Sequence, residues 1–419
     1  MEELAIFLSR VLLGWLIIQV FFVFLLVLYL RLSRNTLLPD NQLPKTAVIL
    51  CLRGADPFLP KCLQALVNQN YPIYDVKIIV DSQDDPAWTI ATNTINNLDA
   101  NNVQISPLRV KRYNCSLKCS SLVQAVSDLD DSYKVVAFVD ADAVVHPTWL
   151  RELVSPLANP KIGATTGNRW YLPTGKYWGT LVRYFWNVSA VLQMSLYQIA
   201  WGGTLAIKTE LIHETGLLDK WGRAYVDDTP IRSVLAKHGK VVKFVPSLLI
   251  LNREECDLPR LFRWLKRQLL ASRLYHPWWW AVVADSILTI LLPTTVLVLF
   301  FTTLLTGQWT VAAVSFSSFA SYTMTLLLLT IILEQAVQPI LCNHNHPTTK
   351  FTIPTLIRMF VALPLTQWVY GLAMFFSLWM SKVNWRGVTY CVSRPWDIRL
   401  IEYRPYQLHD EPGDRQVSI

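Results

Sequence analysis

The sequence lacks internal repeats, low-complexity tracts and any paired framework of cysteines. Its seven cysteines are an odd set, which favours a reducing compartment such as the cytosol over an oxidising one. Charged residues make up only 16% of the chain, and the long apolar stretches contain few of them. Because charged side chains usually mark a transport path through a membrane, a transporter fits this sequence poorly.

The first apolar stretch, residues 4–30, exceeds the roughly 20 residues that span a bilayer. It is too long for a secretory signal and has no small-residue cleavage site, so we expect a retained anchor. Arg31 and Arg34 follow it, and basic residues beside a membrane segment favour the cytoplasmic side. The region after Arg31 is therefore predicted to be cytosolic.

Three further apolar segments lie in the last third of the chain, at residues 279–305, 309–333 and 356–380. Tryptophans lie near their edges, as in an interfacial belt, so we expect a multi-pass integral membrane protein. The formal net charge of +8 and the pI near 9.1 suit a protein that contacts anionic lipid and attracts an anionic substrate.

The number of crossings conflicts with the charges of the C-terminal tail. Three crossings after a cytosolic domain would place the C-terminus outside, whereas Lys382, Arg386 and Arg394 favour the inside. We therefore expect that one segment does not cross the membrane. The last segment is the candidate, because Pro364 should break its helix.

The region between the anchor and these segments alternates short apolar strands with helices. The predicted strands are residues 47–53, 76–81, 108–111 and 135–140, and the predicted helices include 86–98 and 117–128. Uninterrupted Val/Ile/Leu strands that alternate with helices predict a parallel sheet buried on both faces. Such sheets bind ligands beyond the carboxyl ends of their strands, so polar residues there are the first functional candidates.

The pattern divides the chain into four parts. Residues 1–34 form the N-terminal transmembrane anchor, and residues 44–277 form a cytosolic catalytic domain that ends in a basic interfacial helix. Residues 278–381 hold the membrane segments, and residues 382–419 form a cytosolic tail.

The first polar cluster, Asp81, Asp84 and Asp85, follows the second predicted strand. Carboxylates at this place can accept hydrogen bonds from a uracil or a ribose. A helix N-cap is an equally good interpretation of Asp84 taken alone.

The second cluster, Asp140 and Asp142, forms an Asp-x-Asp motif at the end of a buried strand. Hard carboxylate oxygens suit Mg²⁺ or Mn²⁺, which keep part of their coordination sphere for a diphosphate. An Asp-x-Asp motif also occurs in surface turns, so its position at the strand end carries the interpretation.

The third cluster, Asp227 and Asp228, follows a Gly-rich run at residues 201–208. Two adjacent carboxylates could cap a helix. They could also take the proton from an acceptor hydroxyl as it attacks.

The fourth cluster contains Arg260 and Arg263, followed by Trp264, on a basic stretch. Arginines at i and i+3 share a helical face, and their guanidinium groups match phosphate geometry. A basic helix that lies on anionic lipid is the alternative, and both can hold for one segment.

The order and spacing of these clusters resemble glycosyltransferase family 2, and within it the ceramide glucosyltransferase branch. The similarity spans residues 44–277, with a weaker echo at 385–390. The runs that carry it are residues 52–57, 84–87, 117–122, 139–140, 227–228 and 260–264.

The resemblance implies an α/β, A-type glycosyltransferase domain with a Rossmann-like, mostly parallel sheet, an N-terminal transmembrane helix and about three C-terminal membrane segments. It implies a UDP-sugar donor, Mg²⁺ or Mn²⁺, a membrane lipid acceptor and no nucleic acid. The donor-binding residues that it implies are Arg53, Asp81, Asp84, Asp85, Lys118 and Asp140. The metal ligands are Asp140 and Asp142, and the catalytic residues are Asp228, Arg260, Arg263 and Trp264.

The implied reaction is a single displacement that inverts the anomeric carbon. Asp228 acts as the base, Arg260 and Arg263 assist the leaving group, and Trp264 shapes the acceptor side. A processive polysaccharide synthase is the nearest alternative, but such enzymes commonly carry Gln where this chain has Arg260. An inactive membrane scaffold is the alternative from another class.

The residues 342–346 contain one cysteine and two histidines and resemble a metal-binding tract. The tract lies in a short loop between membrane segments and lacks a fourth ligand. Chance is therefore the better interpretation of the tract from the sequence alone.

Overall fold

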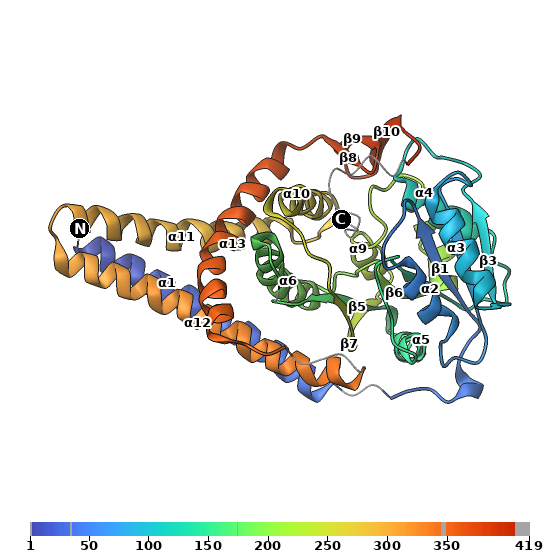
Figure 1. Ribbon diagram of the computed structural model, residues 1–419, viewed down its shortest axis with the longest axis horizontal. Helices are drawn as coiled ribbons and strands as arrows, with labels where there is room; N and C mark the ends of the chain where they lie inside the picture. Colours follow the sequence, from blue (N-terminus) through green and yellow to red (C-terminus); the bar gives the residue numbers. More distant parts are fainter. Residues whose placement is uncertain (1, 34–35, 174, 345–348, 407–419) are drawn as a thin grey trace.

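The computed structural model describes residues 2–33, 36–173, 175–344 and 349–406. A bundle of three long helices projects from one side of an α/β body (Figure 1). The bundle consists of α1 (Glu2–Leu32), α11 (Trp279–Leu305) and α12 (Trp309–Asn343).

The body is built on a seven-stranded sheet with the order β3-β2-β1-β4-β6-β5-β7. The strands are β1 (Thr46–Leu52), β2 (Tyr74–Val80), β3 (Val103–Pro107), β4 (Val135–Val139), β5 (Ile162–Tyr171), β6 (Thr204–Lys208) and β7 (Val241–Asn252). β6 is antiparallel to both of its neighbours, and all the other pairs are parallel. The predicted mostly parallel α/β sheet is therefore confirmed, and every strand except β6 directs its carboxyl end to one edge.

Helices cover both faces of the sheet, which explains why the central strands are apolar throughout. Successive residues of β4 alternate between two cores: Val136 and Phe138 enter one, and Val135 and Ala137 enter the other. The first core is shared with α4 (Leu117–Ser127), α7 (Thr209–Glu214), α8 (Leu217–Trp221) and α9 (Ile231–Ala236). The second is shared with α2 (Leu59–Val67), α3 (Pro86–Asn97) and α5 (Trp149–Val154). The remaining elements of the body are η1 (Asp40–Gln42), η2 (Ser155–Ala158), α6 (Trp178–Tyr197) and α10 (Leu258–Tyr275).

The predicted strands and helices around β1, β2, β4, α3 and α4 are confirmed to within two residues. The strand predicted at residues 108–111 is wrong, because β3 occupies Val103–Pro107 and pairs with β2. Leu108 is buried and its N–H still donates to the Val80 carbonyl at 2.7 Å, which gives it the character of a strand residue. β3 is a half-exposed edge strand, so its own apolar pattern is weak.

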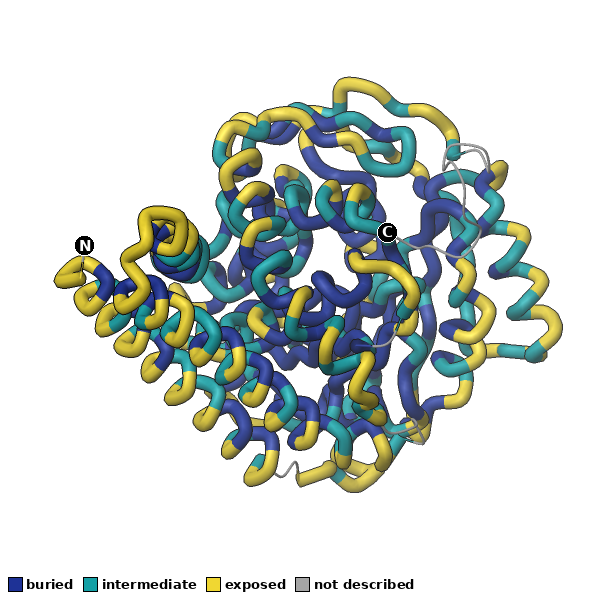
Figure 2. The backbone as a smooth tube through the Cα atoms, turned by 60° about the vertical axis from the view of Figure 1, so that its left-hand side comes forward, coloured by how far each residue is buried: buried dark blue, intermediate teal, exposed yellow. Residues whose placement is uncertain are grey.

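Within the described residues, four helices are long and apolar enough to cross a membrane: α1, α11, α12 and α13 (Ile353–Trp379). Their outer faces are exposed along the bundle (Figure 2). Exposed phenylalanines such as Phe7, Phe21 and Phe24 are suited to contact with lipid. The helix break predicted at Pro364 is wrong, since α13 continues through it. Proline is tolerated inside membrane helices because neighbouring groups satisfy the freed carbonyl.

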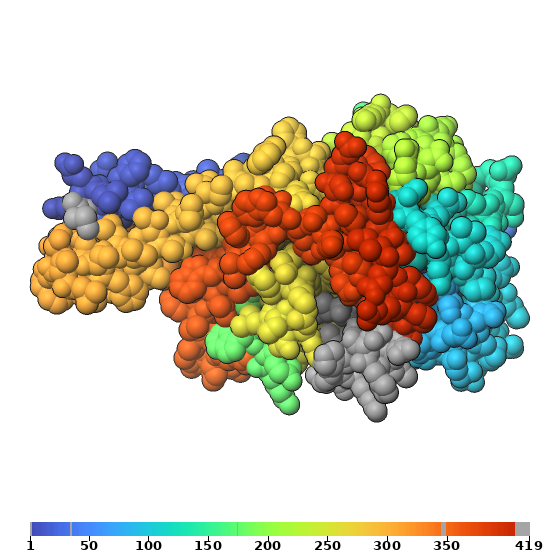
Figure 3. All heavy atoms as spheres, turned by 90° about the horizontal axis from the view of Figure 1, so that it is seen from above, coloured from blue at the N-terminus to red at the C-terminus, as the bar shows by residue number. Residues whose placement is uncertain are grey.

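The last helix and the C-terminal strands return to the body. α13 packs against α6 and α10 rather than only along the bundle. After it, β8 (Lys382–Trp385), β9 (Val388–Arg394) and β10 (Asp397–Tyr403) form an antiparallel sheet. Val383, Val388 and Ile398 of this sheet are buried in the same core as α4. In Figure 3 the sheet, in red, lies between the cyan part of the body and the orange membrane helices.

Candidate active site

Several polar residues meet at the edge where the parallel strands end. Asp140 follows β4, Arg169 lies near the end of β5, and Asn252 ends β7, while Gly202 and Gly203 precede the antiparallel strand β6. Open α/β sheets bind ligands beyond this edge. The geometry there therefore defines the candidate active site.

Lys118 connects the second and third acidic clusters. It is the second residue of α4, and its ammonium nitrogen lies 2.8 Å from Asp140 Oδ1 and 3.2 Å from Asp227 Oδ2. Residues that are far apart in the chain are thus brought into one group of charges.

Arg169 adds a second cation to this group. Its guanidinium nitrogens lie 3.2 Å from Asp140 Oδ2 and 3.8 Å from Asp142 Oδ2. The guanidinium also stacks over the Trp201 ring, 4.9 Å from the ring centroid. Asn252 donates a hydrogen bond to Asp142 Oδ2 at 3.2 Å. Both carboxylates of the Asp-x-Asp motif are therefore oriented by fixed donors.

Asp228 is held in one orientation by three hydrogen bonds. The Gly202 N–H donates to its Oδ2 at 2.9 Å, and the Thr229 N–H and hydroxyl donate to its Oδ1 at 2.6 and 3.1 Å. A Cβ atom on Gly202 would lie only 2.5 Å from Asp227 Oδ2. A glycine is therefore required for the backbone to come this close to the carboxylate pair.

The charged groups shift one another's protonation. Burial alone would raise the pKa of Asp140, but Lys118 and Arg169 outweigh burial and hold that pKa below its ordinary value. Burial raises the pKa of Asp227 to about 6, with a further rise from Asp228 and an opposing effect of Lys118. Burial would lower the pKa of Lys118, but the surrounding carboxylates raise it well above its usual value. Asp227 is thus the group of this set that changes charge nearest to neutral pH.

The predicted donor residues Arg53 and Asp81 are tied to the C-terminal sheet. They form an ion pair in which each side chain is only 3% exposed. Arg53 Nη2 donates to the carbonyls of Arg386 and Arg404, each at 2.6 Å, and the Tyr403 hydroxyl donates to Asp81 Oδ2 at 2.8 Å. Strands from the end of the chain therefore complete this side of the site.

Asp85 caps α3, whereas Asp84 is exposed. The carboxylate of Asp85 accepts hydrogen bonds from the Ala87 N–H at 2.9 Å and from the Gly54 N–H at 2.9 and 3.1 Å. Burial raises its pKa. The cap that the sequence suggested at Asp84 thus lies one residue later.

The residues of the fourth cluster lie in the first turns of α10. Asp257 caps this helix by accepting from the Arg260 N–H at 2.8 Å, and its other oxygen lies 3.7 Å from Arg260 Nε. Arg263 is exposed. Trp264 is buried and packs edge-on against Trp186 of α6, with 5.0 Å between ring centroids.

A family model described as glycosyl transferase family 21 matches residues 13–396. This range includes most of the C-terminal sheet and the acidic cluster, which consists of Asp140, Asp142, Asp227 and Asp228. The chain belongs to glycosyl transferase family 21. The sequence resemblance was to glycosyltransferase family 2, whereas the family shown is family 21. Both families consist of glycosyltransferases. The ceramide glucosyltransferase branch fits family 21.

Two solved structures are similar to this family 21 chain. The mannosyltransferase PcManGT from Pyrobaculum calidifontis, solved with GDP-Man and Mn²⁺, is 16% identical, with a TM-score of 0.51 over 90% of this chain and 99% of that chain. This likeness shows the A-type glycosyltransferase fold. Glucosyl-3-phosphoglycerate synthase from Mycobacterium tuberculosis, solved with Mn²⁺, UDP-Glc and glycerol 3-phosphate, is 14% identical, with a TM-score of 0.36 over 55% of this chain and 81% of that chain.

The family 21 site contains residues that sequence reasoning missed. Arg169 and Asn252 lie at the ends of β5 and β7, as Asp140 lies at the end of β4. The search for polar residues at strand ends would have found them if these two strands had been recognised. Tyr403 carries no such signal, because its strand lies beyond the membrane helices, and Arg386 falls within the weaker echo at residues 385–390.

The charges of this glycosyltransferase site suit a divalent cation. The four carboxylates and two cations described above leave an excess of negative charge, and carboxylate oxygens are the ligands that Mg²⁺ and Mn²⁺ prefer. The nearby Asp56 reflects the same excess, because burial and then the charge of Asp142 raise its pKa to about 6.

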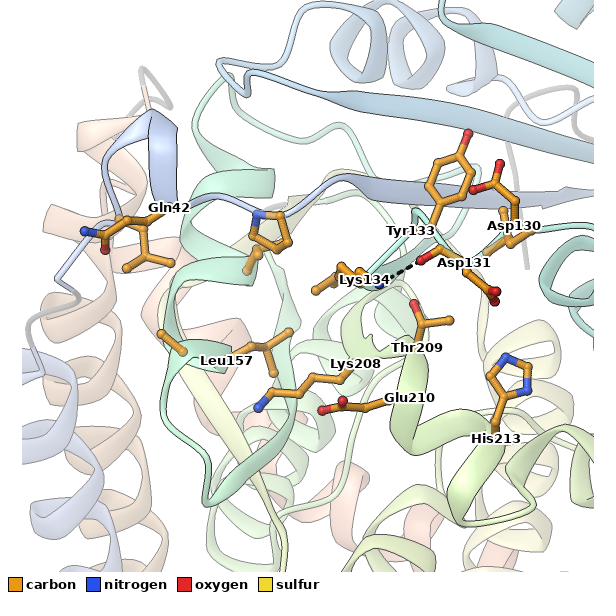
Figure 4. Close-up of a pocket in the computed structure, with 16 residues that line it drawn as sticks. Gln42, Asp130, Asp131, Tyr133, Lys134, Leu157, Lys208, Thr209, Glu210 and His213 are labelled. Atoms are coloured by element: carbon orange, nitrogen blue, oxygen red, sulfur yellow. Dashed lines mark hydrogen bonds between the residues drawn. The ribbon is translucent and has the colours of Figure 1, made fainter.

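A separate pocket of about 470 Å³ lies at the opposite edge of the sheet, where β4 begins and β6 ends (Figure 4). Its lining includes Lys134, Lys208 and Glu210, and Lys134 donates to the Asp131 carbonyl at 2.8 Å. The described residues that line it include none of the acidic cluster. It is therefore separate from the candidate active site.

Proposed function

We propose that this family 21 glycosyltransferase transfers a sugar from a UDP-sugar to the hydroxyl group of a membrane lipid, with inversion at the anomeric carbon. The observation that carries the proposal is the group of charges at the sheet edge. A fixed carboxylate, Asp228, lies there beside the Lys118–Asp227 contact.

In this mechanism Asp228 takes the proton from the acceptor hydroxyl as that hydroxyl attacks the anomeric carbon. Its three hydrogen bonds keep one carboxylate orientation, and a carboxylate within hydrogen-bond reach is an effective general base. Because the hydroxyl attacks directly, the reaction needs no covalent intermediate on the enzyme.

Asp140 and Asp142 would hold Mg²⁺ or Mn²⁺. Such a cation, when bound, neutralises charge on a departing diphosphate. PcManGT was solved with GDP-Man and Mn²⁺, which supports a nucleotide-sugar donor and a divalent cation here. Lys118 and Arg169 are oriented by the same aspartates, so we assign them to the stabilisation of the leaving group as well.

We assign the uridine to the end of the site formed by Arg53, Asp81 and Tyr403. The Oδ1 atom of Asp81 is buried and has no hydrogen-bond partner among the described residues. A buried acceptor of this kind suits a donor group such as the uracil N–H. Asp84 and Asp85 follow on the same turn and stay predicted donor-binding residues.

The proposal of a lipid acceptor rests on how the body meets the apolar helices. α6 and α10 both pack against α13, and Trp264 of α10 lies in the core that α13 shares. We assign Trp264 to the acceptor side, and Arg260 and Arg263 to the leaving group. Ceramide is the acceptor that the family branch implies, and diacylglycerol, hopanoid and carotenoid alcohols are the competitors to test.

The test uses purified protein in detergent with labelled UDP-sugars, Mn²⁺ and a total lipid extract. Label in a metal-dependent glycolipid is expected, and Asp228→Asn should lower kcat by about 10²- to 10⁴-fold while the donor still binds. Asp219→Asn, at an exposed position on α8, is the matched control. Label in a water-soluble polymer would favour a polysaccharide synthase instead, and a failure to consume any donor would favour an inactive scaffold.

A further inference from the structure

We propose that His146, Glu152 and His344 form a second metal site, suited to zinc, where α12 meets the α/β body. Each of the three residues offers one ligand atom, and these atoms all lie within 4.8 Å of one another. Tetrahedral zinc with bonds of about 2.0–2.1 Å needs ligand atoms about 3.3 Å apart, so the two imidazole rings and the carboxylate must turn toward a common point to close the site. His344 belongs to the tract at residues 342–346, of which residues 345 and 346 lie outside the described part of the chain, and the other two ligands come from a distant part of the sequence.

Three separate elements supply the three ligands. His146 lies in the loop between β4 and α5, Glu152 in the first turn of α5, and His344 directly after the end of α12. His146 and Glu152 are 9% and 8% exposed, and the fully buried Trp149 anchors α5 in the core between them. The positions of these two ligands are therefore fixed by the packing of the body.

The two imidazole rings are stacked, with 3.6 Å between centroids and 13° between planes. The stacking brings together two imidazole groups from separate parts of the chain. Neutral imidazole is the form that binds a metal ion.

Fixed oxygen atoms orient both rings. The Thr148 hydroxyl donates to Glu152 Oε1 at 2.6 Å, so its oxygen is left to accept from His146 Nδ1 at 3.0 Å. His344 Nε2 lies 3.1 Å from the Ser247 carbonyl oxygen, which can only accept. Metal-binding histidines usually donate one N–H to such an oxygen, because this contact orients the ring.

The carboxylate of Glu152 gives an independent indication of a ligand. Its Oε2 atom is buried and has no hydrogen-bond partner among the described residues. A buried carboxylate oxygen without a partner is unfavourable, and a bound cation would satisfy it.

The ligand chemistry separates this site from the acidic cluster. Two imidazoles and one carboxylate suit zinc, whereas Mg²⁺ and Mn²⁺ prefer sites made only of oxygen atoms. Three protein ligands leave one position for water. A zinc ion here would hold the end of α12 against the β4–α5 loop and the first turn of α5, and so fix the body against the membrane helices.

The experiment measures metal content and melting temperature of the full-length protein in detergent, after treatment with a chelator and re-addition of Zn²⁺ in the presence of excess Mn²⁺. About one tightly bound zinc per chain and a higher melting temperature are expected. Glu152→Gln, which keeps the shape and the acceptor for Thr148, and His344→Ala should each weaken zinc binding by about tenfold or more and abolish the rise. His213→Ala, at an exposed histidine of α7, is the matched control. It should keep both the zinc binding and the rise in melting temperature.

The proposal is overturned if the chelator-treated protein binds no zinc, or if Glu152→Gln and His344→Ala bind zinc as tightly as the unmodified chain. The melting temperature of each variant without zinc separates loss of the metal from a general loss of folding. Because metal content is measured directly, the outcome does not depend on sugar transfer.

Discussion

Asp227 and Asp228 are adjacent in the chain but have different surroundings. Asp228 accepts three hydrogen bonds, whereas Asp227 Oδ2 faces the ammonium group of Lys118 at 3.2 Å. Carboxylates in different environments take different roles in one reaction. In the proposed mechanism the pair therefore combines a fixed proton acceptor with a charge partner for Lys118.

Activity is expected to increase as the pH rises through about 6. Burial, with a smaller effect of Asp228, raises the pKa of Asp227 to about 6, so below that pH the carboxylate is protonated and its pairing with Lys118 is lost. The measurement is kcat/KM as a function of pH. In Asp227→Asn the activity should be lower and the acid limb near pH 6 should disappear. An unchanged limb in this variant would assign it to another group.

The C-terminal sheet contributes to the proposed donor site. Tyr403→Phe removes the hydroxyl that donates to Asp81, and a hydrogen bond to a charged group contributes about 1.5–3 kcal/mol. We expect the KM for the UDP-sugar to rise by about tenfold or more, with little change in kcat. Tyr113→Phe, at a side chain that is 70% exposed, is the control. A loss confined to kcat would place Tyr403 in the chemical step instead.

Glu334 links α12 to the body. Its side chain is fully buried, and its Oε2 accepts from Trp170 Nε1 and from the Tyr184 hydroxyl, both at 2.9 Å. Glu334→Ala should lower the free energy of unfolding by about 3 kcal/mol, because two buried donors lose their acceptor. Thermal melting in detergent measures the effect.

The melting temperature of Glu334→Gln should lie between those of Glu334→Ala and the unmodified chain, since the amide oxygen still accepts a hydrogen bond. Thr325→Ala, at a half-exposed position of α12, should have the melting temperature of the unmodified chain. Equal melting of Glu334→Ala and Thr325→Ala would contradict the role given to this carboxylate.

The central parallel strands could be predicted from the sequence because burial on both faces makes them continuous apolar runs. β1, β2 and β4 were found in this way, together with Asp81 and Asp140 at their ends. β5 and β7 were not recognised, and Arg169 and Asn252 were missed with them. The contacts of Arg53 with the C-terminal sheet could not be predicted, because they depend on how segments from opposite ends of the chain pack.

At the scale of the whole molecule, the four apolar helices divide into two sets. α1, α11 and α12 run together, and the N-terminus and the turn between α11 and α12 lie at the far end of the bundle (Figure 1). α13 lies across this bundle. Of the four helices, it has the largest buried share of its apolar segment, 44%. We propose that the three bundle helices cross the membrane and that α13 lies at the cytosolic interface, which places the C-terminal tail inside.

This topology can be tested by labelling single cysteines in intact cells, with the exposed Cys342 and the half-exposed cysteines replaced by serine. Gly307→Cys, in the turn after α11, should react with an impermeant maleimide. Asn101→Cys in the body and Arg394→Cys after α13 should react only when the membrane is permeabilised. Labelling of Arg394→Cys in intact cells would show that α13 crosses.

The donor end of the site joins Arg53 to the backbone of Arg386 and Arg404. During translation these later residues leave the ribosome only after α11, α12 and α13 have been made. Until the apolar helices have been made, the C-terminal sheet cannot cover the ion pair between Arg53 and Asp81 in the newly made α/β body. Biosynthesis itself thus delays the appearance of a complete enzyme until the protein has reached the membrane in which its proposed acceptor resides.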